Sequence, residues 1–540
     1  MRIKSHWLIL IASVWFATVL NLALWRFVID KIEVEAGITN FLFMLSLPLV
    51  VMAPLYILFS IIVVPYLAKP LLALLLITSA ATNYFMFELG VYIDVDMLRN
   101  TFETNTREAL DLLTWSKVLW VAGLGVIPAA LIAATKIEYG IFRVELAKRA
   151  GSVLLLLAVI SGLLVATFGH YAPFVRNNRQ ARKIINTQNY IYAATKYFLD
   201  NKKAKREFVN ISYDAKHVPF RDPHRTVLVL VLGETARAAN FQLLGYGRET
   251  NPLLSKQDVI AFRDVNACGT STAVSVPCIF AHTGRSDFSV VAARHTGNLL
   301  DIAQAAGYRV IWLDNDDGCK GVCARADVVK RMVEINDPKH CDGKFCRDEA
   351  LLEHIPGLLK NIEQDTLIVL HTMGSHGPTY YKRYPDSFRK FAPTCDTASI
   401  QKCSRAELLN TYDNTILYTD FIISSVIDML KKHPEYEAGM IYISDHGESL
   451  GENNVYLHGL PYTIAPKEQT HVPKIIYMND TMKRWDYIDW ECLRRDAATK
   501  SYTHDNLFHS VLGLLEIKSK KYKPALDIFK PCRTKELFSE

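Results

Sequence analysis

Carboxylate and imidazole side chains follow short apolar runs in the C-terminal part of this 540-residue sequence. Glu234 comes directly after a valine-rich run, and Asp445 and His446 come shortly after a second apolar run. Two further histidines, His376 and His458, lie beside glycines. A set of carboxylate oxygens and imidazole nitrogens suits Zn²⁺. Each of these residues alone is more often a cap or turn residue, so the metal-site hypothesis depends on their convergence.

The segment 268–278 (CGTSTAVSVPC) supplies hydroxyl groups that could act as a nucleophile. A free hydroxyl reacts poorly at neutral pH, but coordination to a metal ion lowers its pKa. If Thr272 opens a helix, the backbone N–H groups there would also favour a bound phosphate. The alternative is a capping box or a Ser/Thr-rich turn without a role in catalysis.

The elements that must position these residues follow an alternating pattern from about residue 225 onward. Continuous apolar runs of this length are typical of buried strands in a mainly parallel sheet. The runs are 226–232, 308–313, 366–370, 440–443 and 474–478, and helical segments such as 297–306, 348–362 and 407–432 separate them. This alternation predicts a doubly wound α/β domain, in which ligands collect beyond the carboxyl ends of the strands.

The composition indicates that another part of the chain lies in lipid. Hydrophobic residues make up 50% of the sequence and charged residues only 21%, with a mean hydropathy of +0.10. These values exclude a disordered chain, a collagen and a small disulfide scaffold, and a net charge of +6 is too weak to indicate nucleic acid. A spanning helix needs about 20 apolar residues. Candidate spans lie near 7–28, 42–66, 70–92, 117–136 and 152–169.

Charged residues between the spans predict the orientation. Arg2 and Lys4 precede the first span, and four basic residues lie between the fourth and fifth spans, which is typical of cytoplasmic loops. The loop 93–116 is rich in carboxylates, which places it on the opposite side. Five spans then put everything after residue 170 outside the cytoplasm.

The ten cysteines support this orientation, since all of them fall between Cys268 and Cys532. Disulfides persist in oxidising compartments such as the bacterial periplasm. The sequence does not fix their connectivity, and we expect nearest neighbours to pair. The expected pairs are Cys268/Cys278, Cys319/Cys323, Cys341/Cys346, Cys395/Cys403 and Cys492/Cys532. The alternative is that Cys319-x3-Cys323 and Cys341-x4-Cys346 are zinc knuckles.

We predict three regions: a transmembrane domain (1–169), a bridging segment (170–224) and a globular catalytic domain (225–540). The bridging segment interleaves basic residues with tyrosines and phenylalanine. This pattern favours an interfacial helix lying on anionic lipid, with an ordinary solvated linker helix as the alternative.

Five segments together resemble the lipid A phosphoethanolamine transferases, inner-membrane enzymes of Gram-negative bacteria that include the polymyxin-resistance transferases. The segments are GET at 233–235, CGTST at 268–272, DND at 314–316 with Lys320, GSHGP at 374–378 and SDHGE at 444–448. The resemblance covers essentially the whole chain. It implies five transmembrane helices (an all-α membrane domain), a bridging helix and an alkaline-phosphatase/sulfatase-like α/β domain in the periplasm.

By position, the resemblance implies that Glu234, Thr272, Asp445 and His446 bind a catalytic zinc ion and that Thr272 is also the nucleophile. His376 and His458 match histidines that hold the transferred group, bind a second zinc ion or donate a proton.

Outside this set, the resemblance implies that Lys320 contacts phosphate. Three further residues match a family trio near the substrate entrance, and their spacing of four places them on one helix face: Asn100, Thr104 and Glu108. Without the resemblance, such a trio is more often a solvated helix face. His371 matches no family role.

The implied mechanism is a double displacement. Thr272 attacks the phosphorus of phosphatidylethanolamine, diacylglycerol leaves, and a lipid A phosphate then takes the phosphoethanolamine from Thr272. The membrane and these two lipids are the expected partners, and a monomer without nucleic acid is expected. The acceptor position, the number of zinc ions and a role in polymyxin resistance stay open.

Three alternatives remain at this point. A related transferase could move phosphoglycerol, or could add phosphoethanolamine to core sugars such as Kdo or heptose. A sulfatase or phosphatase would hydrolyse its substrate, but the segment 275–279 (SVPCI) lacks the arginine of a sulfatase motif. A membrane scaffold or transporter would need inward-facing polar residues, for which Glu88 is the chief candidate.

Overall fold

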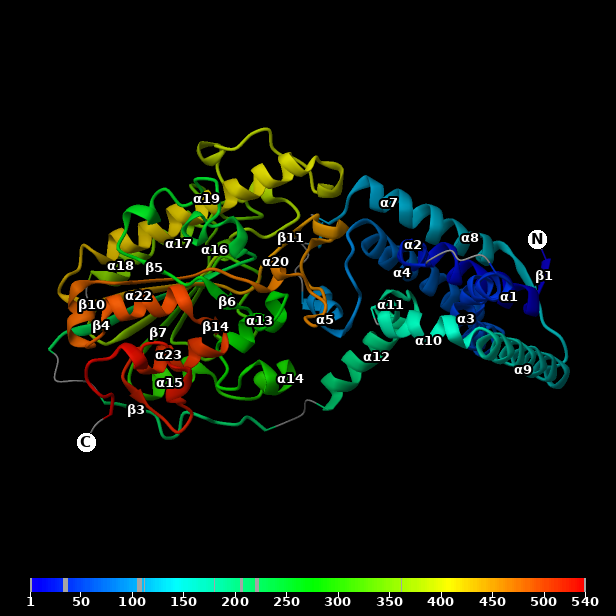
Figure 1. The fold of residues 1–540 in the computed structure, drawn as a ribbon, viewed down its shortest axis with the longest axis horizontal. Coiled ribbons are helices and arrows are strands. Elements are labelled where there is room, and N and C mark those ends of the chain that lie inside the picture. Colours follow the sequence, from blue (N-terminus) through cyan, green and yellow to red (C-terminus); the bar gives the residue numbers. More distant parts are fainter. Residues whose placement is uncertain are drawn as a thin grey trace. The chain divides into compact units, whose positions relative to one another are not determined.

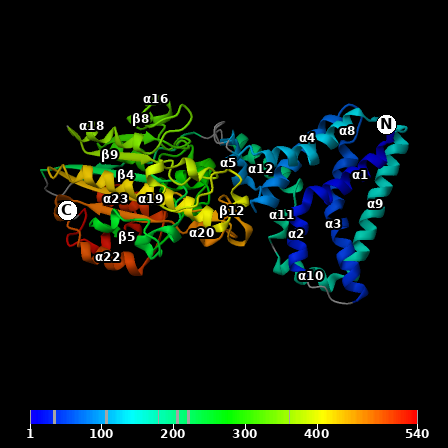
Figure 2. The same ribbon diagram turned by 90° about the horizontal axis from the view of Figure 1, so that it is seen from above.

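A computed structural model describes residues 2–32, 37–103, 109–110, 112–178, 180–203, 207–218, 223–360 and 362–538. The chain forms two compact units. The first comprises Met1–Leu98 with Leu113–Tyr197, and the second comprises Arg99–Leu112 with Phe198–Glu540. Figures 1 and 2 show the elements of both units, and each unit is described by itself.

In the described part of the first unit, five helical segments are long and apolar enough to cross a membrane, as predicted. They are Ser5–Lys31, Ile38–Ile62, Ala68–Glu88, Trp115–Ala134 and Phe142–Ala166. The last of these, α9, begins about ten residues before the predicted span. Glu145 and Arg149 pair across one turn of this helix, at 3.1 Å. An ion pair at this spacing stabilises the helical turns that precede the apolar stretch.

The first and second spans each contain an irregularity. The first consists of α1 (Ser5–Ala17) and α2 (Leu22–Lys31), joined by a 3₁₀ turn. The second, α3 (Ile38–Ile62), holds Pro48 and Pro54 within the helix. α3 packs against both α1 and α9 (Figure 2). Neighbouring helices of this kind let membrane helices tolerate proline.

The fourth span packs closely against α4 (Ala68–Glu88). It consists of α7 (Trp115–Val121), a π-helical turn and α8 (Ile127–Ala134). Gly125 in the π-helical turn permits this approach, because a Cβ atom there would lie 3.1 Å from the Cα of Ile77.

The segment after α9 is helical in three pieces: α10 (Phe168–Asn177), α11 (Ala181–Ile184) and α12 (Gln188–Lys203). Asn186 ties it to the membrane unit, since its side-chain amide donates to the carbonyls of Leu20 (2.7 Å) and Ser79 (2.8 Å). The interfacial position of this segment stays a prediction.

The second unit is built on a seven-stranded sheet among the described residues, in the order β5-β13-β10-β4-β9-β7-β8. Five of these strands coincide with the predicted runs: β4 (Arg225–Gly233), β7 (Arg309–Asp314), β9 (Thr366–His371), β10 (Tyr436–Ser444) and β13 (Lys474–Met478). The sequence did not indicate the edge strands β5 (Ile260–Ala261) and β8 (Val328–Arg331). Only β13 runs in the opposite direction, so its pairs with β10 and β5 are antiparallel and the other strand pairs are parallel.

Strand β4 shows why these runs are continuously apolar. Its residues 228, 230 and 232 belong to one hydrophobic cluster, and residues 227, 229 and 231 belong to another, so both sheet faces are buried. Helices α15 (Leu299–Ala305) and α23 (Asp505–Leu514) contribute to the first cluster, and α19 (Arg405–Leu430) contributes to the second. The predicted doubly wound arrangement is therefore present.

The strand register brings four carboxyl ends to one edge of the sheet. Ser444 of β10 pairs with Gly233 of β4, and Leu232 of β4 pairs with His371 of β9. His371 in turn pairs with Asp314 of β7. The polar residues that end or follow these strands must therefore lie side by side.

The predicted disulfide pairing is confirmed. Cys268–Cys278, Cys319–Cys323, Cys341–Cys346, Cys395–Cys403 and Cys492–Cys532 are all bonded. Every cysteine of the chain lies in the described part, so none is left as a thiol to form a zinc knuckle.

A buried lysine predicts an unusual dependence of stability on pH. The Lys474 side chain is fully buried, its ammonium lies 4.9 Å from the Phe262 ring centroid, and burial lowers its pKa to about 7. Between pH 7 and its unfolded pKa of about 10.5, the unfolded chain binds a proton that the folded chain lacks. Stability should therefore rise with pH in this window, by at most about 1.4 kcal/mol per pH unit.

Thermal or denaturant unfolding from pH 7 to 10 measures this slope. Lys474→Met should flatten it and should raise stability at pH 7, where the unaltered chain carries the charge at a cost. An exposed control, Lys432→Met, should leave the slope unchanged. An equal slope in Lys474→Met and the unaltered chain would contradict the assignment.

Candidate active site

Glu234, Asp445 and His446 form a buried group at the carboxyl end of the sheet. One ligand atom from each lies within 4.8 Å of the others, and all three side chains are fully buried. His446 Nε2 lies 3.5 Å from Glu234 Oε1 and 3.4 Å from Asp445 Oδ2. Adjacent parallel strands β4 and β10 supply these residues, which explains how positions 211 residues apart meet.

Thr272 joins this group from a different element. It is the first residue of α13 (Thr272–Ile279), so its hydroxyl lies at a helix N-terminus. The hydroxyl donates toward the Glu234 carboxylate, with Oγ1 3.2 Å from Oε2 and 3.3 Å from Oε1. Oγ1 also lies 3.4 Å from His446 Nε2. The structure thus brings together the four residues that the resemblance implied as zinc ligands, while ligation itself stays a prediction.

The chemistry of this group fits a zinc ion. Asp445 Oδ2 is buried and has no hydrogen-bond partner among the described residues. The Nδ1–H of His446 donates to the Gly447 carbonyl at 2.9 Å, which leaves the Nε2 lone pair facing the carboxylates. Burial, followed by the neighbouring His458, lowers the pKa of His446 to about 4, so the imidazole is neutral. A neutral imidazole, two carboxylates and a hydroxyl form an N,O donor set that zinc accepts.

The two carboxylates are costly to bury without a cation. Burial, followed by the charges of Asp445 and Asp316, raises the pKa of Glu234. Burial also raises the pKa of Asp445 to about 6. A divalent cation between these oxygens would offset both the desolvation and the repulsion.

His458 and His376 extend the group into a cluster of imidazoles. The ring centroid of His458 lies 4.3 Å from that of His446 and 6.0 Å from that of His376. His458 Nδ1 donates to Glu448 Oε2 at 2.8 Å, which orients the ring. The roles of both histidines stay predictions.

Glu448 is a site residue that the sequence reasoning did not assign. Besides binding His458, it accepts a hydrogen bond from the Tyr380 hydroxyl. Burial raises its pKa to about 8. Its place two residues after His446, in the segment that carries the resemblance, was the signal available in the sequence.

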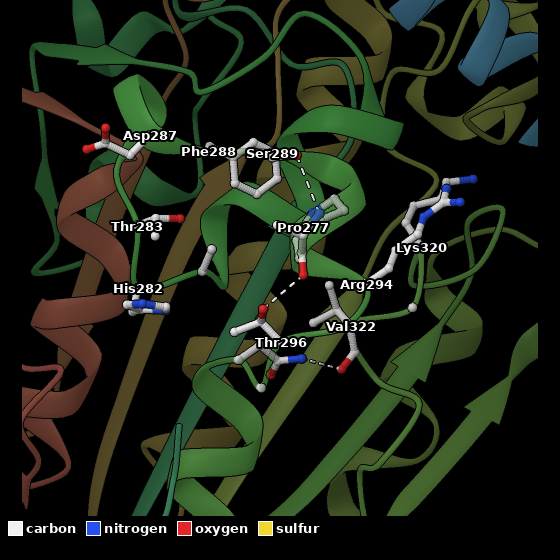
Figure 3. A pocket seen from close by; sticks show the side chains of 16 residues that line it. Pro277, His282, Thr283, Asp287, Phe288, Ser289, Arg294, Thr296, Lys320 and Val322 are labelled. Carbon is white, nitrogen blue, oxygen red and sulfur yellow. Dashed lines mark hydrogen bonds between the residues drawn. The ribbon is translucent and has the colours of Figure 1, made fainter. Parts of the chain in front are cut away.

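Lys320 does not belong to the four-residue group in this structure. Its ammonium pairs with Asp317 at 3.3 Å, and its side chain lines a cavity of about 70 Å³ together with Pro277 of α13 (Figure 3). Contact with a substrate phosphate remains a prediction for this lysine.

The predicted trio near the substrate entrance is only partly described. Asn100 lies on α5 (Val95–Glu103). Thr104 and Glu108 lie outside the described residues. Their common helix face therefore stays a prediction.

Family models match both parts of the chain. The Sulfatase family matches residues 226–517, and the family described as Phosphoethanolamine transferase EptA/EptB matches residues 51–201. The first match coincides with the α/β unit that carries the site, and the second begins within α3 and ends within α12.

Similar proteins match over nearly the whole length. Phosphoethanolamine transferase EptA of Escherichia coli (strain K12) is 39% identical over 531 residues, which cover 98% of this chain and 96% of the relative. Phosphatidylethanolamine transferase Mcr-2 of Escherichia coli is 37% identical and covers 90% of each chain. The solved structure of the integral membrane protein lipooligosaccharide phosphoethanolamine transferase A from Neisseria meningitidis is 39% identical, with a TM-score of 0.94 over 97% of this chain and 98% of that chain.

Proposed function

The chain belongs to the phosphoethanolamine transferase family, and we propose that it moves phosphoethanolamine from phosphatidylethanolamine to lipid A through Thr272. It is an inner-membrane enzyme with a periplasmic catalytic domain. The donor is suggested by the name of the Mcr-2 relative, and the acceptor by the lipooligosaccharide transferase with the solved structure.

The observation that carries this proposal is the position of the Thr272 hydroxyl. The buried hydroxyl lies beside the Glu234 carboxylate and the neutral imidazole of His446, at the N-terminus of α13. The backbone N–H groups of that helix end favour a phosphate beside the hydroxyl. A hydroxyl poised for attack beside an anion site is what a covalent phosphotransfer requires.

The chain's own residues account for the first displacement. The Thr272 hydroxyl donates its proton toward Glu234, and its oxygen attacks the donor phosphorus. The bond from phosphorus to the diacylglycerol oxygen breaks, and this oxygen takes a proton from His376 or His458. The Glu448 carboxylate holds His458 in a fixed orientation for this transfer.

The second displacement reverses these roles. A phosphate oxygen of lipid A attacks the phosphorus bound to Thr272, and Thr272 leaves. A zinc ion bound by Glu234, Thr272, Asp445 and His446 would supply Lewis-acid stabilisation of negative charge and lower the pKa of the threonine hydroxyl. Water must be excluded between the two displacements, and the burial of Thr272 (6% exposed) favours this.

Labelled phosphatidylethanolamine tests the proposal. Membranes containing the protein should move the labelled headgroup to lipid A, and mass spectrometry of lipid A from cells with and without the protein should show the added group. Label on core sugars would show that the acceptor is a core sugar and not lipid A, and release of free phosphoethanolamine would indicate a hydrolase. If phosphatidylethanolamine keeps its headgroup, the proposal as a whole is contradicted.

A further inference from the structure

A second group of buried donors lies beside the first and shares Glu234 with it, while its other two members, Asp316 and His371, have no role in the proposed displacements. Glu234, Asp316 and His371 each place one ligand atom within 4.8 Å of the others. The side chains of Glu234 and His371 are fully buried, and that of Asp316 is 3% exposed.

His371 is oriented as a metal-ligating histidine would be. Its Nδ1–H donates to Asp314 Oδ2 at 3.1 Å. The Asp314 carboxylate also accepts hydrogen bonds from Trp312 Nε1 (2.8 Å) and from the Gly318 N–H (3.2 Å). Metal-ligating histidines almost always donate their other ring N–H to a carboxylate, a carbonyl or water, and His371 meets this condition.

The other ring nitrogen of His371 points at the donor group. His371 Nε2 is buried and has no hydrogen-bond partner among the described residues. It lies 3.6 Å from Asp316 Oδ2. A buried nitrogen without a hydrogen bond costs about 1–3 kcal/mol, and a cation between the ring and the carboxylates would remove this cost.

The order of strands explains why two donor groups share Glu234. β10, β4, β9 and β7 lie side by side, and their carboxyl ends are aligned. β10 with β4 supplies the group that contains Asp445 and His446. β4 with β9 and β7 supplies the group that contains His371 and Asp316. Glu234 follows β4, the strand common to both.

We propose that Glu234, Asp316 and His371 bind a second divalent cation, with Glu234 shared between the two sites. One imidazole and two carboxylates suit Zn²⁺ or Mn²⁺ better than Mg²⁺, which prefers oxygen ligands. The cation would offset the repulsion between Glu234 and Asp316 and would fix the carboxylate that faces Thr272. The inference rests on the proposed function through Glu234 alone.

Metal content of the full-length protein tests this site without reference to activity. The detergent-purified chain is stripped with a chelator and dialysed against Zn²⁺, or in a parallel arm Mn²⁺, and bound metal is measured by mass spectrometry. Asp316→Asn and His371→Gln should each bind about one equivalent less than the unaltered chain in at least one of the arms. His433→Gln, at a half-buried position, and Asp428→Asn, at an exposed position of the same unit, should show no loss.

Two further variants separate the possible results. Asp445→Asn tests the first site. If this variant keeps its full metal content, the zinc site proposed under the function is contradicted, and the result for Asp316→Asn still decides the second site. The proposal is overturned if Asp316→Asn keeps its full metal content in both the Zn²⁺ and the Mn²⁺ arm. It is also overturned if the second equivalent of metal is lost only in the double variant His376→Gln/His458→Gln. Asp316→Asn is nearly isosteric, so it decides the question if His371→Gln does not fold.

Discussion

Thr272→Ala should abolish phosphoethanolamine transfer, lowering the rate by at least about 10³-fold. The substitution removes the hydroxyl that lies within 3.4 Å of both Glu234 and His446. Losing a nucleophile removes the covalent route altogether rather than weakening one interaction. The rate is measured as labelled headgroup transferred from phosphatidylethanolamine to lipid A in membranes.

Thr270 provides a matched control in the same segment. Its hydroxyl donates to the Leu460 carbonyl at 2.7 Å rather than to a carboxylate. Thr270→Ala should therefore cost only about 1 kcal/mol of stability and retain transfer. Thr272→Ser keeps a hydroxyl and should retain part of the activity.

Mass spectrometry with donor alone gives a second test of the same assignment. The unaltered enzyme should carry phosphoethanolamine on the peptide that contains Thr272, and Thr272→Ala should not. Near-normal transfer by Thr272→Ala, or an adduct on another residue, would show that Thr272 is not the nucleophile.

The sequence was sufficient for the strands and spans because continuous apolar runs report burial directly. It predicted β4, β7, β9, β10 and β13 from composition alone. It missed β5 and β8, since two-residue and half-exposed edge strands bury too little to leave an apolar run. It also placed the start of α9 too late, because an ion pair rather than hydropathy supports the first turns.

The site was harder to predict, because it depends on register rather than on local pattern. The sequence suggested that Glu234 and Asp445 follow strands, but only the pairing of Ser444 with Gly233 shows that they meet. The sequence placed His371 directly after the apolar run 366–370 but gave it no role. Its significance appears only when Asp314 and Asp316, which are distant in sequence, lie beside it.

Glu234→Gln should have effects of opposite sign on activity and on the stability of the metal-free protein. Glutamine keeps the shape but is a weaker metal ligand and cannot accept the Thr272 proton, so transfer should fall by about 10²–10⁴-fold. In the chelator-treated protein, the substitution removes a buried carboxylate that lies close to Asp445 and Asp316. The metal-free variant should therefore be more stable than the metal-free parent, by about 1–2 kcal/mol, or a few °C in melting temperature.

Adding Zn²⁺ should reverse that order. A ligand that binds only the folded state raises stability, so zinc should raise the melting temperature of the parent and raise that of Glu234→Gln much less. Glu437, a buried glutamate at the opposite end of β10, serves as the control, because Glu437→Gln should leave both transfer and the zinc-induced shift intact. An equal zinc-induced shift in Glu234→Gln and the parent would show that Glu234 binds no metal. A metal-free variant less stable than its parent would show that this carboxylate stabilises the fold instead of being held there for catalysis.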